Sequence, residues 1–389
     1  MRRLRWEETI ADMFSVFPIV ALLGPRQCGK TTLARDYASQ QGDFTPTSAF
    51  DLEDLVDVAR LSEPRLALSE REGLVVLDEI QLMPELFSLL RVMADRRPNP
   101  ARFLILGSAS PHLIRGASES LAGRVGMLGL TPFDAREVDE LPRLWLRGGY
   151  PRSYLAQNDR TSAQWREAYV RTFLERDLPA FGIDLPSNRI RRFWTMLAHL
   201  HGGIFNASEL GGSLGVSHPT VRRYLDILTG TFMVRELAPF HENIGKRQVK
   251  APKIYIRDSG LLHRLLGLDS MDALESHPKL GASWEGFALE ETIRAHEARP
   301  EECFFWATHG GAELDLLIEK DGRRLGFEFK RADAPRLTRS MRVALDDLKL
   351  DSLTVVAPHV PEYPLGERIV VRSLASLTAL PDRGDFRAI

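Results

Sequence analysis

Apolar and polar positions recur with different periods along the chain, and together they predict an α/β protein. Unbroken apolar runs are typical of strands buried on both faces of a parallel sheet, and they occur at 19–23, 74–77 and 103–106. Between Pro142 and about Leu200, Trp, Arg and Leu recur at helical spacing, which predicts a helical connector or lid. The pattern in the last third of the chain predicts a hairpin within residues 311–330. A helix (281–296) and a strand (303–307) are expected before it, and a helix (336–348) and a strand (353–357) after it.

The hairpin within residues 311–330 has charged residues at unusual positions. Asp321-Gly322 is a strong two-residue turn signal between two alternating runs. If these two residues form the loop, Asp315 faces Glu328 and Glu313 faces Lys330 across the hairpin. Like charges directly opposed on a sheet destabilise it, so the pair of carboxylates needs an explanation.

Residues 206–237 have the spacing of a winged helix-turn-helix, in which the second helix enters a DNA major groove. Ser208 is expected to cap a short helix, and His218-Pro219 to begin the second helix. The candidate DNA contacts are Thr220, Arg222 and Arg223 on that helix, with Lys246 and Arg247 in the basic segment 245–253. Two alternatives stay open, because such modules also serve ATPases as protein-packing lids and a basic segment can be a solvated linker.

Composition is that of an ordinary globular chain. With 389 residues, two or three domains are expected. The hydrophobic share of 44% and the charged share of 27% argue against disorder, and the net charge of −2 neither favours nor excludes nucleic acid. Cys28 and Cys303 are the only cysteines, which excludes a disulfide framework and fits the reducing cytoplasm. No run is long enough to span a membrane, and the apolar run near the N-terminus lacks a signal-peptide cleavage site.

The stretch GPRQCGKT satisfies the phosphate-binding pattern G-x-x-x-x-G-K-[ST]. It follows the first apolar strand and opens a helix at 31–38, which is the context that this pattern requires. Backbone N–H groups and the helix N-terminus would hold the phosphates of ATP, Lys30 would reach the β- and γ-phosphates, and the Thr31 hydroxyl would hold Mg²⁺. The nucleotide-binding residues are therefore expected to be Gly24, Pro25, Arg26, Gln27, Cys28, Gly29, Lys30, Thr31 and Thr32.

The strand 74–77 ends in Asp78-Glu79, at the edge where ligands bind in parallel sheets. Asp78 would bind Mg²⁺, and Glu79 would polarise the attacking water, so hydrolysis is favoured over storage of the nucleotide. Ser108 follows the next strand, where it would either sense the γ-phosphate or serve as a plain turn residue. Arg124 is a candidate arginine finger towards a neighbouring subunit, with a surface arginine as the alternative.

The order helix, three strands, helix and strand in the last third resembles the restriction-endonuclease-like fold. The signature of that fold is an acid on one strand and E-x-K on the next, matched by Asp315 and by Glu328-Phe-Lys330, although Leu314 replaces the usual proline. Glu285 is placed like an extra acid on the preceding helix. Asp315 and Glu328 would share Mg²⁺ or Mn²⁺, with Lys330 assisting catalysis. An ordinary ion-pair lattice and a nuclease fold that has lost cleavage are the open alternatives.

A wider resemblance covers nearly the whole chain. The blocks GPRQCGKTTLA, VVLDEIQ, LILGSAS and ESLAGRV, followed by RGGYPRSYL, LERDLPAFG, KIYIRDSGLL and LGASWEGFALEE, resemble the AAA-like predicted prokaryotic ATPases that carry a C-terminal domain of unknown function. The first four blocks are specific for nucleotide binding, whereas the later blocks carry no mechanism by themselves.

These patterns and resemblances predict four domains in an α/β chain. They are an AAA-like P-loop ATPase domain (1–140), a helical connector or lid (141–200), a winged helix-turn-helix (201–245) and a restriction-endonuclease-like domain (246–389). The predicted function is a cytoplasmic, Mg²⁺-dependent, homo-oligomeric ATPase that couples ATP turnover to the remodelling or processing of DNA. The alternative is a nucleotide-driven switch or scaffold, in a defence or toxin-like system, whose inactive nuclease fold only binds.

Overall fold

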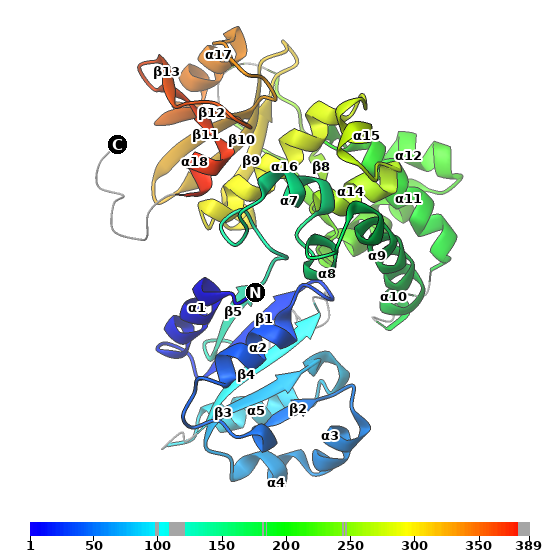
Figure 1. Ribbon diagram of the computed structural model, residues 1–389, viewed down its shortest axis with the longest axis vertical. Coiled ribbons are helices and arrows are strands. Elements are labelled where there is room, and N and C mark those ends of the chain that lie inside the picture. The colour runs from blue at the N-terminus through cyan, green and yellow to red at the C-terminus, as the bar shows by residue number, and fades with distance from the viewer. Residues whose placement is uncertain are drawn as a thin grey trace. The chain divides into compact units, whose positions relative to one another are not determined.

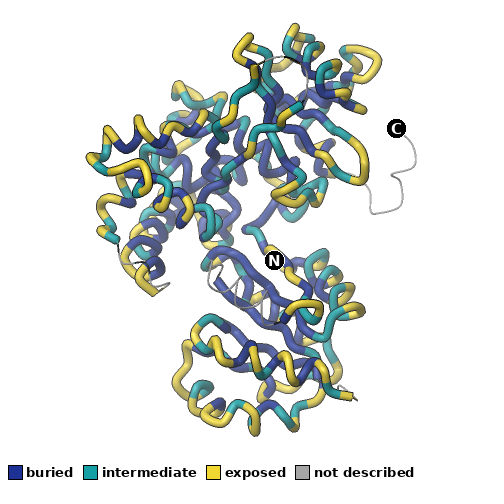
Figure 2. The backbone as a smooth tube through the Cα atoms, turned by 180° about the vertical axis from the view of Figure 1, so that it is seen from behind, coloured by how far each residue is buried: buried dark blue, intermediate teal, exposed yellow. Residues whose placement is uncertain are grey.

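The computed structural model describes residues 1–97, 101–108, 121–180, 183, 185–242, 245 and 247–379 (Figures 1 and 2). The chain separates into two compact units. The first unit contains residues 1–132 and 230–232, and the second unit contains residues 133–229 and 233–389. The finer division into four domains stays a prediction. Within the described residues, no helix combines the length and the apolar character needed to cross a membrane.

The first unit is built on a parallel sheet in the order β2-β3-β4-β1-β5. Its strands are β1 (Ile19–Gly24), β2 (Ala49–Asp51), β3 (Gly73–Asp78), β4 (Ala101–Ser108) and β5 (Val125–Gly129). The α-helices among its described residues are α1 (Leu4–Phe14), α2 (Lys30–Ala38), α3 (Leu55–Arg60), α4 (Pro64–Ser69) and α5 (Leu86–Ala94). The three predicted strands are confirmed.

The unbroken apolar runs of this sheet supply two separate hydrophobic cores. Because side chains alternate along a strand, Ile19 and Ala21 of β1 pack with residues of α4 and α5, whereas Val20 and Leu22 pack with residues of α1 and α2. Helices therefore cover both faces of the sheet, and its strand ends are left to carry polar residues.

The second unit begins with helices and continues into a sheet. The helices are α7 (Leu141–Arg147), α8 (Pro151–Tyr154), α9 (Asp159–Thr172), α10 (Leu178–Ala180), α11 (Ser187–Leu200), α12 (Ala207–Leu214), α13 (His218–Gly230), α14 (Ser259–Leu266) and α15 (Met271–Glu275). Asn206, not Ser208, caps α12, because its side-chain oxygen accepts the backbone N–H groups of Ser208 and Glu209. The proposed cap was therefore two residues too late.

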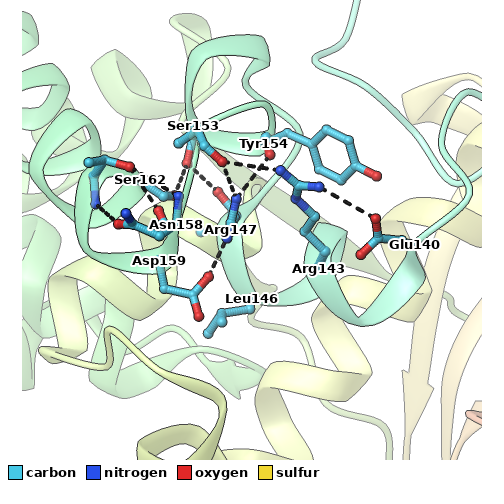
Figure 3. A network of polar contacts seen from close by, with 12 residues as sticks. Glu140, Arg143, Leu146, Arg147, Ser153, Tyr154, Asn158, Asp159 and Ser162 are labelled. Atoms are coloured by element: carbon cyan, nitrogen blue, oxygen red, sulfur yellow. Dashed lines mark hydrogen bonds and ion pairs between the residues drawn. The ribbon is translucent and has the colours of Figure 1, made fainter.

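The block RGGYPRSYL forms the polar junction between α7, α8 and α9 (Figure 3). Arg147 is buried, and its guanidinium donates to Asp159 Oδ1 at 2.6 Å and to the carbonyl of Ala156 at 2.6 Å. The buried hydroxyl of Ser153 donates to the carbonyl of Arg147 at 2.6 Å. The same hydroxyl lies 2.8 Å from the hydroxyl of Ser162. These contacts give the block a structural role.

Nine strands among the described residues form one mixed sheet in the second unit, in the order β13-β14-β12-β11-β10-β9-β7-β8-β6. They are β6 (Gly203–Ile204), β7 (Val234–Pro239), β8 (Lys253–Ile256), β9 (Cys303–Ala307), β10 (Glu313–Lys320), β11 (Arg323–Phe329), β12 (Ser352–Ala357), β13 (Tyr363–Gly366) and β14 (Ile369–Ser373). The remaining helices are α16 (Leu280–Ala295), α17 (Arg339–Asp347) and α18 (Leu374–Thr378). All elements predicted for the last third are present within a few residues of their expected ends.

Strand β7 joins the two parts of this sheet, because it has a different partner along each half. Its first half pairs antiparallel with β8, and Ala238 and Pro239 pair in parallel with β9. The strands after α13 and the strands after α16 therefore belong to one hydrogen-bonded structure.

The β10–β11 hairpin has the predicted register. Leu316 pairs with Phe327 and Lys320 with Arg323, which leaves Asp321-Gly322 as the loop. The φ angles of Asp321 and Gly322 are 52° and 74°, as a type I′ turn requires. The paired residues end at Leu316 and Phe327, so the predicted pair Asp315 and Glu328, like Glu313 and Lys330, lies beyond the β10–β11 ladder.

Candidate functional site

The loop between β1 and α2 has the geometry of a phosphate-binding loop. The backbone of Gln27 and Gly29 is left-handed, with φ of 60° and 102°. A Cβ atom at Gly24 would lie 2.3 Å from the carbonyl oxygen of Leu130, so only glycine fits there. Lys30 is 5% exposed, and its Nζ donates to the carbonyls of Gly24 and Pro25 at 3.0 Å each. The predicted lysine is therefore held inside the loop.

The two predicted Mg²⁺ ligands meet at the ends of α2 and β3. The Thr31 hydroxyl donates to Asp78 Oδ2 at 2.6 Å, and Asp78 Oδ1 accepts the backbone N–H of Glu79 at 2.9 Å. Burial raises the pKa of the Asp78 carboxyl, and the hydrogen bond from Thr31 opposes this shift. A hydroxyl and a carboxylate beside a phosphate-binding loop are a donor set that fits Mg²⁺ with a nucleotide.

Glu79 and Ser108 are also brought together. The Ser108 hydroxyl donates to Glu79 Oε2 at 3.3 Å, and Glu79 has a left-handed backbone with φ of 54°. The side-chain amide of Gln81 donates to the same carboxylate. Gln81 was missed by the sequence reasoning, although it belongs to the quoted block VVLDEIQ. Its contact orients Glu79, whereas the γ-phosphate-sensing role of Ser108 stays a prediction.

The other residues of the loop have different surroundings. Arg26 forms an ion pair with Glu53. Cys28 is fully buried, its thiol lies 3.8 Å from the carbonyl of Leu130, and burial raises its pKa, so its side chain packs instead of reacting. Thr32 is exposed.

Arg3 was not predicted as part of this region. It is 6% exposed, and its Nη1 donates to the carbonyls of Cys28 at 3.3 Å and Thr131 at 2.9 Å. It therefore ties the phosphate-binding loop to the end of the first unit. The only signal in the sequence was the basic start MRRLRW, which also resembles a targeting segment.

Arg124 lies at the opposite edge of the sheet from the phosphate-binding loop. It precedes β5, and its carbonyl accepts the backbone N–H of Ile19 at the start of β1, whereas the loop follows the end of β1. Its guanidinium binds both carboxylate oxygens of Asp95, at 2.6 and 2.8 Å. It cannot reach the loop of its own chain, so a role as arginine finger requires a neighbouring subunit.

A second cluster of charged groups lies in the second unit and contains the predicted C-terminal residues. Asp315 and Glu328 are 5% and 4% exposed. Asp315 Oδ2 accepts the backbone N–H of Phe329 at 2.9 Å and lies 3.5 Å from Lys330 Nζ. Lys330 Nζ also lies 2.6 Å from Glu328 Oε2. The predicted pairing of Lys330 with Glu313 is thus replaced by contacts with the two buried carboxylates.

Strand β8 adds two residues to this carboxylate cluster that the sequence reasoning missed. Lys253 is 5% exposed, and its Nζ contacts Glu313 Oε1 and lies 3.6 Å from Glu285 Oε1 and 4.0 Å from Asp315 Oδ1. The Tyr255 hydroxyl donates to Glu285 Oε1 at 2.6 Å. Lys253 belongs to the basic segment 245–253, which the sequence analysis interpreted either as a DNA contact or as a solvated linker.

The protonation of the cluster reflects burial and crowding of like charges. Burial and the charge of Asp315 raise the pKa of Glu285 to about 7 and that of Glu328 to about 8. Burial alone would lower the pKa of Lys253, but the surrounding carboxylates, Glu285 first, raise it above its usual value. The two lysines therefore stay charged and balance the carboxylates.

A divalent metal ion does not fit this cluster as it stands. The described part of the chain contains no group of three or more His, Cys, Asp or Glu side chains that could hold a metal ion. The predicted acids are together, but ammonium groups occupy the space that they share.

The residues predicted to contact DNA differ in availability. Arg222 binds both carboxylate oxygens of Glu236 at 2.8 and 2.7 Å and also lies 2.9 Å from Asp226. Arg223 and Arg247 are exposed, and the Thr220 hydroxyl lies 2.9 Å from that of Ser217. Lys246 lies outside the described residues. Arg222 thus fixes α13 against β7.

Known families match three successive parts of the chain. The AAA domain matches residues 16–139, a domain of unknown function (DUF8612) matches 138–272, and a second domain of unknown function (DUF4143) matches 280–377. With the loop geometry above, the AAA match identifies the first unit as an AAA-like P-loop ATPase domain.

Two curated relatives match nearly the whole length of the chain and show its family. Uncharacterized protein Rv2008c of Mycobacterium tuberculosis and Uncharacterized protein Mb2031c of Mycobacterium bovis are each 53% identical over 355 residues, which is 91% of this chain and 79% of theirs. The chain belongs to the family of these mycobacterial proteins. Among solved structures it is similar to the Walker-type ATPase PABY2304 of Pyrococcus abyssi, with 16% identity and a TM-score of 0.48 over 67% of this chain and 95% of the other.

Proposed function

We propose that the first unit hydrolyses ATP with the help of Mg²⁺. The observation that carries this proposal is the hydrogen bond of 2.6 Å between the Thr31 hydroxyl and Asp78, directly beside the phosphate-binding loop. This pair supplies oxygen ligands of the kind that Mg²⁺ prefers. When bound, Mg²⁺ neutralises charge on the phosphate oxygens.

The remaining residues have separate roles in this proposal. Lys30, positioned by two loop carbonyls, places its positive charge beside the phosphates. Glu79 orients and polarises the attacking water, and its carboxylate is positioned by hydrogen bonds from Ser108 and Gln81. Arg124 acts in the site of a neighbouring chain in a homo-oligomer, after release from Asp95.

The direct test is ATP hydrolysis by wild type and Lys30→Ala, with Mg²⁺ and with excess chelator. Wild type is expected to turn over ATP only with Mg²⁺, and Lys30→Ala to lose at least about 100-fold in rate. Arg35→Ala is the matched control, because Arg35 is an exposed cation on the same helix α2 and is not among the predicted nucleotide-binding residues. Equal hydrolysis by wild type and Lys30→Ala would refute the proposal.

The second unit supports a second candidate function, the binding of DNA coupled to ATP turnover. The order α11, β6, α12, α13, β7 and β8, with β8 paired between β6 and β7, is typical of a winged helix-turn-helix. The order from α16 to β12, helix, three strands, helix and strand, supports the restriction-endonuclease-like fold that was expected from the sequence. Arg223 on α13 and Arg247 are exposed and would contact phosphates.

DNA-stimulated ATP hydrolysis separates this function from a switch or scaffold. Duplex DNA is expected to raise the rate in wild type, and Arg223→Ala to weaken DNA binding and lower its salt dependence. Exposed Arg192 on α11 offers a control at a site that was not predicted to bind DNA. A rate indifferent to DNA would favour the nucleotide-driven switch.

A further inference from the structure

The carboxylate cluster of the second unit has an unusual charge arrangement. Two ammonium groups, those of Lys253 and Lys330, face four carboxyl groups: Glu285, Glu313, Asp315 and Glu328. The carboxyl groups come from α16, β10 and β11, so the fold and not one local segment brings them together.

Lys253 lies among the carboxylates, whereas Lys330 lies at the rim. Lys253 Nζ is within 4.0 Å of oxygens from three different carboxylates, and its side chain is 6% exposed. The Lys330 side chain is 38% exposed. A carboxylate oxygen of Asp315 faces each lysine, Oδ1 towards Lys253 and Oδ2 towards Lys330. Removing Lys253 would therefore open the inner part of the cluster.

The position of Lys253 is fixed by its strand. It is the first residue of β8, and it pairs with Ile204 of β6 on one side and with Leu237 of β7 on the other. Its Nζ also lies 5.6 Å from the centre of the Phe305 ring, which favours a cation at that point. Backbone pairing on both sides thus delivers this ammonium group to the carboxylates.

An ammonium group and a divalent ion compete for the same space. Mg²⁺ binds oxygens at about 2.0–2.1 Å in octahedral geometry, whereas an ammonium–carboxylate hydrogen bond spans about 2.7–2.9 Å. Two cations a few ångströms apart also repel each other strongly in a partly buried site. We propose that the ammonium group of Lys253 takes the place of a divalent metal ion in the carboxylate cluster. The charge of the carboxylates is then balanced without a bound metal ion.

Mn²⁺ binding tests this directly, measured by electron paramagnetic resonance on the nucleotide-free full chain. In the cluster, Lys253→Met is expected to bind one Mn²⁺ with an affinity at least about tenfold higher than that of wild type. Lys330→Met is the matched control, because it removes the same charge at the rim and should gain no such site. Adding Asp315→Asn to Lys253→Met should abolish the gain, which separates the cluster from Thr31 and Asp78.

Two results would overturn the proposal. One is Asp315-dependent Mn²⁺ binding by wild type at the affinity of the Lys253→Met variant. The other is a folded Lys253→Met protein that binds no more Mn²⁺ than wild type. If Lys253→Met unfolds, Lys253→Gln and thermal unfolding with Mn²⁺ replace it: Mn²⁺ should raise the melting temperature of the variant but not of wild type. A melting temperature that Mn²⁺ leaves unchanged would equally overturn the proposal.

Discussion

Glu290 is expected to hold the second unit together through a buried ion-pair network. It lies on α16 and is 1% exposed. Arg235 of β7 binds both of its carboxylate oxygens, and Arg257 and Arg294 lie 3.5 and 3.8 Å from Glu290 Oε2. Replacing the carboxylate by the amide in Glu290→Gln keeps the shape but leaves the buried Arg235 and the partly buried Arg257 and Arg294 without this counter-charge.

The size of the effect follows from the pKa of Glu290. Burial alone would raise this pKa, but the arginines, Arg235 first, lower it from 4.5 to about 2. A shift of this size corresponds to about 3 kcal/mol of stability at neutral pH. Removing one partner of a buried ion pair typically costs about 3–5 kcal/mol, which agrees in magnitude. We therefore expect Glu290→Gln to lower the free energy of unfolding by about 3 kcal/mol.

The pH dependence has a definite sign. Because the folded-state pKa lies below the unfolded-state value, the stabilisation is complete above the unfolded-state value of 4.5 and is lost as the pH falls towards about 2. The difference in stability between wild type and Glu290→Gln should therefore be constant near neutral pH and shrink in acid.

Urea unfolding followed by tryptophan fluorescence measures this difference. Five of the six tryptophans lie in the second unit: Trp145, Trp165, Trp194, Trp284 and Trp306. Glu301→Gln is the control, because the Glu301 side chain is 65% exposed and lies 3.5 Å from Arg299, and an exposed ion pair of this kind contributes little to stability. A loss below about 1 kcal/mol in Glu290→Gln, or a difference independent of pH, would refute the reasoning.

Three further predictions concern other parts of the chain. Glu79→Gln should bind ATP but hydrolyse it at least about 100-fold more slowly, and hydrolysis at the wild-type rate would exclude Glu79 as the residue that activates water. Arg124→Ala should lower ATP hydrolysis about 1,000-fold at concentrations where the chain self-associates, and an unchanged rate would exclude the arginine finger. Gly286→Ala should cost about 1–3 kcal/mol in urea unfolding, because its Cβ would lie 2.1 Å from His201 Nε2, whereas Gly281→Ala on the same helix meets nothing within 4 Å and should not destabilise.

Local signals explain why much of the fold could be predicted. The unbroken apolar runs predicted buried parallel strands because both faces of that sheet are covered by helices. Asp321-Gly322 predicted the hairpin register because both residues accept the positive φ angles that a type I′ turn needs. The phosphate-binding loop and Asp78 were predictable because their spacing and strand ends are fixed by the ligand chemistry.

What the sequence did not predict depends on contacts between distant residues. Lys253 lies 62 residues before Asp315, and only the pairing of β8 with β6 and β7 brings it to the carboxylates. Arg222 matches the expected position of a DNA contact, but the bidentate contact with Glu236 of β7 occupies it. Neither partner leaves a periodic pattern in the sequence, so both contacts require the three-dimensional structure.

The double pairing of β7 limits how the second unit can be divided. The edge of β9 that faces away from β10 is covered by Ala238 and Pro239 of β7. Gln248 and Val249 continue this cover at the end of the strand. A chain cut before residue 280, at the start of the DUF4143 match, would lose all four of these residues and expose an apolar strand edge. Such an edge invites pairing with other chains and aggregation. The family boundary at residue 280 is therefore a poor place to separate a soluble fragment.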